Sequence, residues 1–377
     1  MKPLSDYDDF LRVEDTVNIL VKNTNVSNYD FGFRQHFECK SIIDMQDEPV
    51  LLRIGAIQDF DEVKNDLESV GCSLMYSSED YKLATSFERW YPLLEDLTPR
   101  SKVYEEFPSL EEVQKDFEFP FFLKGDRQTS KHQRKLSIIE NGEMFAEARE
   151  IWMRDKILHW QKPVIREYVP LHILDEESFP DMLPICFEFR VFVYKGMIVQ
   201  VAPYWTMGPE YRSIGRSKED RRGFYNILSE VMKRIRIPFL VVDIAKTADG
   251  QWILIEINDG QESGFAGADA LRLWTKLIRI ERCFSYSWVV QEEETESDGD
   301  GFYEVLWPKG IVFWPNGVTF EDQLGRRLVC TEKIMYQEKL SRCWMKFSFP
   351  EGADKNIPPT KLRLVEPFDC MRDIIFL

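Results

Sequence analysis

Two apolar, β-branched runs that flank Asp249-Gly250 constrain the fold of this 377-residue chain more than any other feature. Residues 238–258 have the composition of a β-hairpin, and an Asp-Gly pair is a strong signal for its turn. With that pair at the two central turn positions, Asp243 lies directly opposite Glu256. Asn258 then points to the same face as Glu256, because side chains alternate along a strand.

These three polar side chains would converge within strands that are otherwise apolar enough to be buried. Like charges that face each other destabilise a sheet, and an uncompensated buried charge costs more. We therefore expect a cation beside them. Oxygen ligands without sulfur or imidazole suit a hard ion, most simply Mg²⁺ that bridges phosphates. The alternative is a solvated sheet face with ordinary surface acids.

A second polar feature lies upstream, where residues 118–124 predict a strand that ends in Lys124 and returns through residues 136–139. The connection, residues 125–135, carries four cations and two hydroxyl side chains: Arg127, Lys131, Arg134, Lys135, Thr129 and Ser130. A basic loop of this kind favours a lid that closes on phosphates. A solvated basic loop is the alternative.

Two further strands carry candidate binding groups. Residues 163–169 predict a strand whose end, Glu167-Tyr168-Val169, offers a carboxylate and two backbone groups, and main-chain hydrogen bonds there could pair with a purine edge. Residues 186–194 alternate strictly, with Arg190 in the middle of the strand. A mid-strand arginine is either part of a structural ion pair or a group that orients an anion.

Residues 1–95 have the pattern of a small α/β domain. A strand is predicted over 50–57, a helix over 59–70 and a second strand over 72–76, an order that favours a parallel pair. The first forty residues show no pattern to which we assign a role.

The remaining elements divide the rest of the chain. Residues 96–284 hold the motifs above and three predicted amphipathic helices, at 142–159, 217–235 and 268–283, the last with Leu271, Trp274 and Leu277 on one face. Residues 285–300 are an acidic linker. Residues 301–377 predict a β-rich module, with a hairpin at 311–320 and strands at 327–330 and 344–349.

Composition excludes several classes of function. A net charge of −17 and a pI near 4.9 argue against non-specific binding to nucleic acid or a membrane surface. Seven dispersed cysteines without a C-x-x-C pair indicate reduced thiols, not a disulfide framework or a zinc site. With no signal sequence and no run of membrane-span length, we expect a cytoplasmic protein.

The order of these parts, over roughly residues 96–283, resembles the ATP-grasp superfamily. Lys102 looks like the family's upstream lysine, Lys124 like its strand lysine, and the loop with Lys131 like its phosphate loop. The adenine hinge would be Glu167, Tyr168 and Val169, and the strand arginine would be Arg190. The metal-binding hairpin would carry Asp243, Glu256 and Asn258. One departure is the phosphate loop, which is usually glycine-rich and here has only Gly125, so side-chain cations would replace main-chain contacts. The chain is similar to the lysine-dependent branches of the superfamily, whose substrates are mostly unassigned.

The resemblance implies an α+β fold in which two subdomains grip ATP, after the α/β domain and before the β-rich module. It implies a carboxylate–amine ligase that forms an acyl phosphate from a small-molecule or peptide acid. ATP and Mg²⁺ would be its cofactors, with the metal on Asp243, Glu256 and Asn258 and with Lys102 and Lys124 on the phosphates. Arg190 would stabilise the transferring phosphoryl group.

Two other functions stay open. One family with an ATP-grasp-like fold acts as an assembly chaperone for a translation initiation factor, and its arginine-bearing strand is somewhat similar. In that case ATP would stabilise a binding surface, and the β-rich module would contact a protein partner. The other alternative is a multidomain scaffold in which the acids are structural.

Overall fold

The structure of the protein is a computed structural model. It describes residues 7–41, 49–55, 57, 59–127, 134–175, 183–206, 217–285, 288–292, 303–306, 319–336, 342–355 and 357–364. Within these ranges, no helix combines the length and the apolar character that a membrane crossing requires.

The N-terminal domain is a five-stranded sheet in the order β3-β1-β2-β4-β5. Its elements are β1 (Asp9–Val13), β2 (Val17–Val21), α1 (Phe33–His36), β3 (Cys39–Ser41), β4 (Pro49–Arg53), α2 (Phe60–Ser69), β5 (Ser73–Leu74), α3 (Ser78–Thr85) and α4 (Phe87–Leu94). As predicted, β4 and β5 are parallel and α2 connects them, although β4 ends at Arg53 and not at residue 57. The first forty residues contain a hairpin and a third strand, for which the sequence had given no assignment.

The next sheet has the order β6-β9-β7-β8. Its elements are β6 (Ser101–Val103), α5 (Leu110–Val113), β7 (Phe121–Gly125), α6 (Arg134–Ser137), β8 (Ile138–Ile139), α7 (Gly142–Arg154), η2 (Leu158–Trp160) and β9 (Pro163–Glu167). Phe145, Ala148 and Trp152 of α7 pack into the core on one face of this sheet. The predicted return strand at 136–139 is half helix, because Leu136 and Ser137 belong to α6.

A second four-stranded sheet follows, in the order β13-β12-β14-β15. Its elements and neighbours are β10 (Ile173–Asp175), β11 (Ile185–Cys186), β12 (Glu188–Tyr194), β13 (Met197–Pro203), α8 (Lys218–Arg234), β14 (Phe239–Lys246), β15 (Trp252–Asp259) and α9 (Ala270–Ser285). Phe224 of α8 packs against Phe189 and Trp252 on one face. Trp274 of α9 packs on the other face, while Leu271, predicted on the same buried face, is exposed.

The central hairpin reaches the predicted register by an unpredicted route. Its loop has three residues, Ala248 to Gly250, because the Thr247 N–H donates to the Gln251 carbonyl, and Gly250 has φ +93°. A β-bulge at Ile255 then shifts the pairing by one residue. The two deviations cancel, so Asp243 and Glu256 are direct partners, as the sequence predicts.

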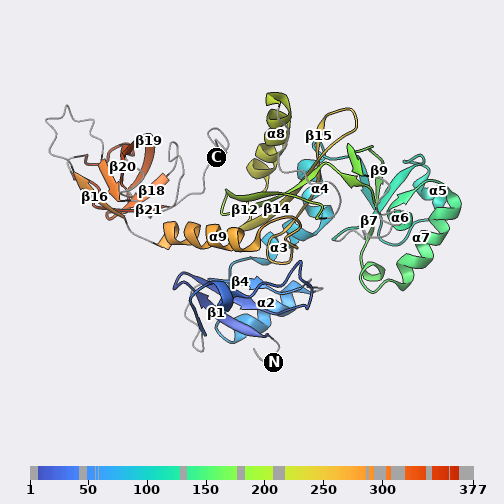
Figure 1. The fold of residues 1–377 in the computed structure, drawn as a ribbon, viewed down its shortest axis with the longest axis horizontal. Helices are drawn as coiled ribbons and strands as arrows, with labels where there is room; N and C mark the ends of the chain where they lie inside the picture. The colour runs from blue at the N-terminus through green and yellow to red at the C-terminus, as the bar shows by residue number, and fades with distance from the viewer. Residues whose placement is uncertain are drawn as a thin grey trace.

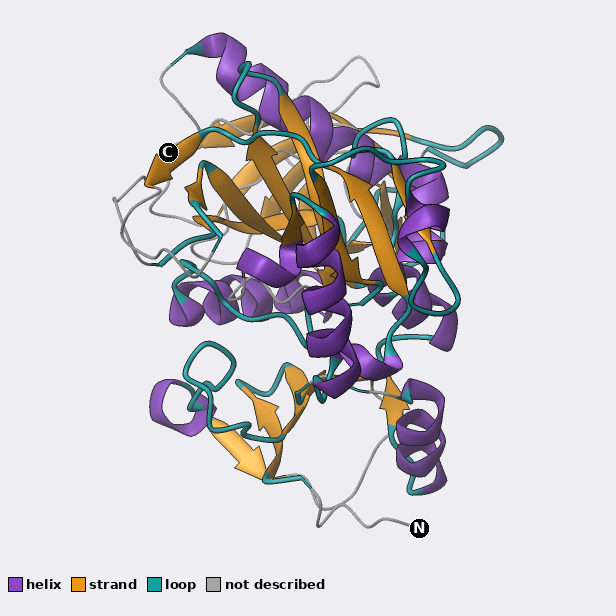
Figure 2. Cartoon of the chain, turned by 90° about the vertical axis from the view of Figure 1, so that its right-hand side faces the viewer, coloured by secondary structure: helices purple, strands orange, loops and turns teal. Residues whose placement is uncertain are grey.

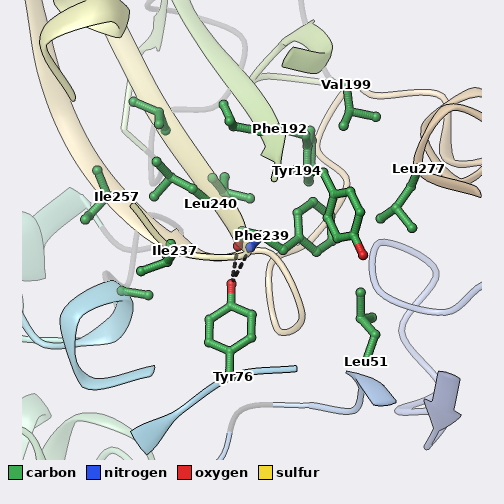
Figure 3. Close-up of a cluster of buried hydrophobic side chains, with 14 of the residues drawn as sticks. Leu51, Tyr76, Phe192, Tyr194, Val199, Ile237, Phe239, Leu240, Ile257 and Leu277 are labelled. Atoms are coloured by element: carbon green, nitrogen blue, oxygen red, sulfur yellow. Dashed lines mark hydrogen bonds between the residues drawn. The ribbon is translucent and has the colours of Figure 1, made fainter. Parts of the chain in front are cut away.

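The N-terminal domain and the second sheet share one hydrophobic core (Figures 1 and 2). Figure 3 shows Leu51 and Tyr76 of the N-terminal domain facing Phe239 and Leu277 across the contact. The Tyr76 hydroxyl bonds the main chain of Phe239, accepting from its N–H at 3.1 Å and donating to its carbonyl. This contact fixes the N-terminal domain against the start of β14.

The C-terminal module is a closed six-stranded sheet beyond the end of α9, at the left in Figure 1. Its strands are β16 (Trp288–Glu292), β17 (Tyr303–Leu306), β18 (Thr319–Asp322), β19 (Arg327–Tyr336), β20 (Arg342–Ser348) and β21 (Lys361–Leu364). The first strand, β16, lies inside the segment 285–300 that was predicted to be a linker. The hairpin predicted at 311–320 lies outside the described residues, apart from Thr319 and Phe320 in β18.

Candidate functional site

A row of three charged side chains crosses the second sheet. Arg190 on β12 pairs with Asp243 on β14, which pairs in turn with Glu256 on β15. The Arg190 guanidinium donates from Nε and Nη2 to the two Asp243 oxygens, at 2.8 and 2.7 Å. Asp243 is fully buried and Arg190 is 7% exposed, so this bidentate pair is an internal one.

The surroundings of Arg190 favour its charged form. Burial alone would lower its pKa, but the Asp243 carboxylate outweighs burial and raises the pKa above its ordinary value. Its Nη1 donates to the Gly264 carbonyl at 2.9 Å, and the guanidinium lies 4.9 Å from the Tyr204 ring centre. The sequence left two roles open for Arg190, a structural ion pair or the orientation of an anion. The structure shows the ion pair with Asp243.

A second buried ion pair connects the two sheets. Lys124 at the end of β7 donates to Glu256 on β15, with 2.6 Å between Nζ and Oε2. The two residues are 132 positions apart, and both are at most 8% exposed. The fold thus brings the predicted phosphate lysine to the predicted metal-binding hairpin.

A cavity of about 110 Å³ lies where the two sheets meet. That volume holds several water molecules or a small planar group. Its lining comes from both sheets and from the segment between them: Pro99, Phe122, Lys124, Ile138, Arg166, Glu167, Tyr168, Val169, Leu171, Ile173, Leu183, Pro184, Cys186, Glu188, Trp205, Ile253, Ile255 and Glu256. The predicted hinge, Lys124 and Glu256 therefore border one space.

Glu167 of the predicted hinge contacts Arg100 through both its side chain and its main chain. The Glu167 carboxylate is exposed and lies 3.8 Å from Arg100, and the Glu167 N–H donates to the Arg100 carbonyl. The sequence reading had offered both this carboxylate and the main chain for ligand contacts. The structure turns the carboxylate toward a neighbouring arginine.

Arg166 is a cavity residue that sequence reasoning missed. It donates from Nη1 to the Ile255 carbonyl at 2.8 Å and from Nε to Ser101 Oγ at 3.1 Å. Burial lowers its pKa to about 10, and Nη2 is buried without a hydrogen-bond partner in the described part of the chain. A cation in an apolar strand, directly before the hinge, was the available signal.

Asn258 completes the predicted oxygen set. It pairs with Val241, two residues from Asp243, so it shares the face of the charged row. Its Nδ2 is buried and, within the described ranges, has no partner. Carboxylate and amide oxygens are ligands that Mg²⁺ accepts, so the donor chemistry fits this ion. The described residues hold no group of three or more His, Cys, Asp or Glu side chains arranged for a metal, so water or phosphate oxygens would supply the remaining ligands.

Two predicted lysines are not part of this group. Lys102 pairs with Ile165 on the face of the first sheet opposite Lys124, and its ammonium pairs with Asp116. Because side chains alternate between the two faces of a strand, Lys102 points away from the cavity and is not among the residues that line it. Lys131 lies outside the described residues.

The chain was compared with known protein families, curated proteins and solved structures. The family described as ATP-grasp domain, R2K clade family 3, matches residues 93–277. No curated protein matches.

The solved structures that match are distant. The chain is 11% identical to a RimK domain protein ATP-grasp from Sphaerobacter thermophilus DSM 20745, over 61% of this chain and 79% of that one, with a TM-score of 0.42. It is 12% identical to D-alanine–D-alanine ligase from Helicobacter pylori, over 71% of this chain and 76% of that one, with a TM-score of 0.44. It is 18% identical to Cdc123 from Schizosaccharomyces pombe, over 50% of this chain and 87% of that one, with a TM-score of 0.36.

The family match covers β7, β9 and the central hairpin, together with every other residue that lines the cavity. It ends within α9 and leaves out most of the N-terminal domain and the whole C-terminal module. The α+β architecture of two sheets with a ligand-sized space between them agrees with the match. Residues 93–277 of this chain are an ATP-grasp domain.

Proposed function

We propose that this protein is a carboxylate–amine ligase that uses ATP and Mg²⁺. The observation that carries the proposal is the cavity between the two sheets, which Lys124, the hinge at 167–169 and Glu256 border together. A partly apolar cavity with a few convergent charged groups is the usual form of a small-molecule site.

One set of residues would bind the adenine and another set would bind the phosphates. The main chain of Tyr168 and Val169 would pair with the adenine edge, and Lys124 would hold phosphate oxygens, as would Lys131. Asp243, Glu256 and Asn258 would hold Mg²⁺, which supplies neutralisation of the charge that develops on the phosphates. Two of the five N–H groups of Arg190 have no hydrogen-bond partner among the described residues, and Arg190 would stabilise the transferring phosphoryl group.

The chemistry needs no side-chain nucleophile. A substrate carboxylate would attack the γ-phosphorus, and ADP would leave with the electron pair of the broken P–O bond. An amine would then attack the acyl carbon of the acyl phosphate, forming the C–N bond and releasing phosphate. The Lys124–Glu256 pair would separate in this scheme, because Lys124 would bind phosphate and Glu256 would be one of the residues that hold the metal.

The test is the melting temperature of the full chain with ATP and Mg²⁺. Wild type gains stability by mass action, whereas Glu256→Gln loses the magnesium-dependent part of that gain. Glu281→Gln is a matched control, because Glu281 is also a partner of a lysine, Lys195, and is partly buried, yet it lies outside the cavity lining. An unchanged gain in Glu256→Gln would remove Glu256 from the metal site.

A second candidate is an ATP-binding protein without turnover, for example an assembly chaperone whose C-terminal module contacts a partner. Three N–H groups of Arg190 are bound to Asp243 and Gly264, an arrangement that favours a structural role for this arginine. ADP release separates the two candidates. A ligase releases ADP and phosphate only when an acid and an amine are both supplied, whereas a chaperone gains the same stability from ATP with negligible release.

A further inference from the structure

Arg166 lies in the wall of the cavity between the two sheets and has one nitrogen without a partner. The residue is 5% exposed and belongs to the cavity lining. Its Nε and Nη1 donate to Ser101 and Ile255, but its Nη2 is buried and has no hydrogen-bond partner within the described ranges. A buried N–H group of a charged side chain that lacks an acceptor is costly. This cost favours an acceptor that enters the cavity with a ligand.

The guanidinium of Arg166 is held in place by three elements. Ser101 belongs to β6 and Ile255 to β15, and the Phe87 ring at the start of α4 lies 5.3 Å from the guanidinium. The side chain could turn toward solvent only by giving up both hydrogen bonds and the contact with the ring. Because a guanidinium is planar, these contacts also fix the direction in which Nη2 donates.

The position of Arg166 along β9 places it beside both groups that are proposed for the nucleotide. Lys124 pairs with Val164, two residues before Arg166, so Lys124 and Arg166 share the cavity face of the first sheet. The hinge at 167–169 follows Arg166 directly. Along the strand, Arg166 therefore stands between the position opposite the phosphate lysine and the main chain proposed for adenine.

The size of the cavity favours the base over the phosphates as the partner of Nη2. About 110 Å³ accommodates a small planar group such as a purine, whereas a triphosphate would extend beyond it. When the N1 and N6 edge of adenine pairs with the hinge, two ring nitrogens with lone pairs remain, N7 and N3. Arginine commonly donates to purine N7 in other recognition sites.

We propose that Arg166 recognises the purine base of the bound nucleotide, with Nη2 as the donor to a ring nitrogen, N7 or N3. The inference rests on ATP binding, which both candidate functions above share. It adds to the hinge a side-chain contact on a second edge of the base. A pyrimidine that pairs with the hinge lacks the fused ring and would leave Nη2 without an acceptor, so Arg166 would make the cavity selective for purines.

The first experiment changes the ligand and leaves the protein intact. Binding of ATP, 7-deaza-ATP and 3-deaza-ATP to the full chain is measured by calorimetry with Mg²⁺. Each analogue replaces one ring nitrogen by C–H and keeps the N6 edge and the triphosphate. We expect one analogue to bind at least about tenfold more weakly than ATP, because a buried charged donor loses its acceptor. Equal affinity for all three ligands would overturn the proposal.

Arg166→Met then assigns the contact to this residue. The variant keeps an apolar stem and removes the donor, so it should bind ATP and the weaker analogue with equal affinity. A structural role for Arg166 would lower stability and leave the preference for ATP unchanged. If Arg166→Met does not fold, Arg166→Lys keeps the buried charge, but its single nitrogen cannot occupy the positions of both Nη1 and Nη2, and the preference should again be lost. A preference that persists in a folded variant would overturn the proposal.

Lys102→Met is the matched control, because Lys102 is a cation on the neighbouring strand β6 that points away from the cavity. It should keep the wild-type preference for ATP over the weaker analogue. Adenosine separates the base from the phosphates, since Arg166→Met should weaken binding of adenosine as well as of ATP. A loss confined to ATP would place Nη2 at a phosphate and overturn the contact with the base.

The same measurements distinguish failure of this inference from failure of the proposed function. If wild type binds ATP and both analogues equally well, nucleotide binding stands and only the role of Arg166 is excluded. If wild type binds none of the three, ATP binding itself is excluded, and the role of Arg166 is excluded with it.

Discussion

At the scale of single residues, the second sheet accommodates buried charges by pairing them, as Arg190 and Asp243 show. Each charge on its own would be costly to bury, and the bidentate geometry offsets that cost only while both partners are present. The same reasoning applies to Lys124 and Glu256, whose bond joins the two sheets. In both pairs, removal of one partner does more damage than removal of both.

Arg190→Met should therefore destabilise the protein by about 3–5 kcal/mol, because Asp243 is left as an unpaired buried charge. The double variant Arg190→Met with Asp243→Leu should recover most of this loss. Urea unfolding measures both free energies. A single variant within about 1 kcal/mol of wild type would show that solvent reaches Asp243.

Glu262 gives a prediction about pH. Burial and then the Asp259 carboxylate raise its pKa in the folded protein to about 8, above its ordinary value of 4.5. The bound proton stabilises the folded state below pH 4.5, and this contribution is lost as the pH rises through 8, because the unfolded chain releases its proton more readily. Across that window wild type should lose free energy of unfolding relative to Glu262→Gln. Urea unfolding at several pH values checks this, and parallel curves would exclude a raised pKa.

Single residues differ in how far the sequence could place them. Asp243, Glu256 and Asn258 were predictable because the strands around them are apolar and their spacing fixes a face. Lys102 could not be placed, since it lies on a three-residue strand whose face no pattern defines. Arg166 was missed although it is a cation in an otherwise apolar strand, because that signal indicates burial and does not say which cavity the side chain borders.

At the scale of elements, the central hairpin shows why a correct pairing can follow from an incorrect turn. The Asp-Gly signal identified the hairpin, but the loop has three residues, and the bulge at Ile255 restores the register. A bulge depends on packing against neighbouring strands, which local sequence does not reveal.

Gly250→Ala should cost about 1 kcal/mol, because a φ of +93° is strained for any residue with a Cβ. The nearest atom to a new Cβ is Lys246 Cε at 3.9 Å, so the cost is conformational and not steric. Gly250→Asn is the matched control, since asparagine tolerates this region better. Thermal unfolding compares the two. An equal effect of both substitutions would point to a different cause.

The N-terminal hairpin illustrates the opposite outcome. Glu14 and Asp15 have φ of 53° and 51°, a turn conformation that usually takes asparagine or glycine. The sequence carries neither residue at this turn, so it contains no local turn pattern that would predict the hairpin of β1 and β2. Their pairing depends on the apolar residues that β2 buries against β4.

At the scale of the whole molecule, the family match and the core describe different units. The match begins at residue 93, whereas the hydrophobic core runs from the N-terminal sheet into β12, β14 and β15 without interruption. The C-terminal closed sheet stands beyond α9 and contributes no residue to the cavity lining. Two of the three parts thus share one core, whereas the closed sheet follows α9 in the chain and contacts it through β21.

Deletion of residues 286–377 should leave nucleotide binding intact, because all six strands of the closed sheet are removed together and the cavity keeps its lining. The melting-temperature gain with ATP and Mg²⁺ should match that of the full chain. Loss of the gain in a truncated protein that still unfolds cooperatively would assign part of the nucleotide site to the C-terminal module.

Arg53 and Arg190 have a consequence for protein engineering. They donate to main-chain oxygens of residues 261, 263 and 264, so a substitution at position 262 leaves these three hydrogen bonds in place. A library that varies this one position should keep the path of the main chain while it changes the side chain that contacts Tyr81 and Ile57. Position 262 is therefore a place where the contact between this loop and the N-terminal domain can be altered without a change in the backbone that carries it.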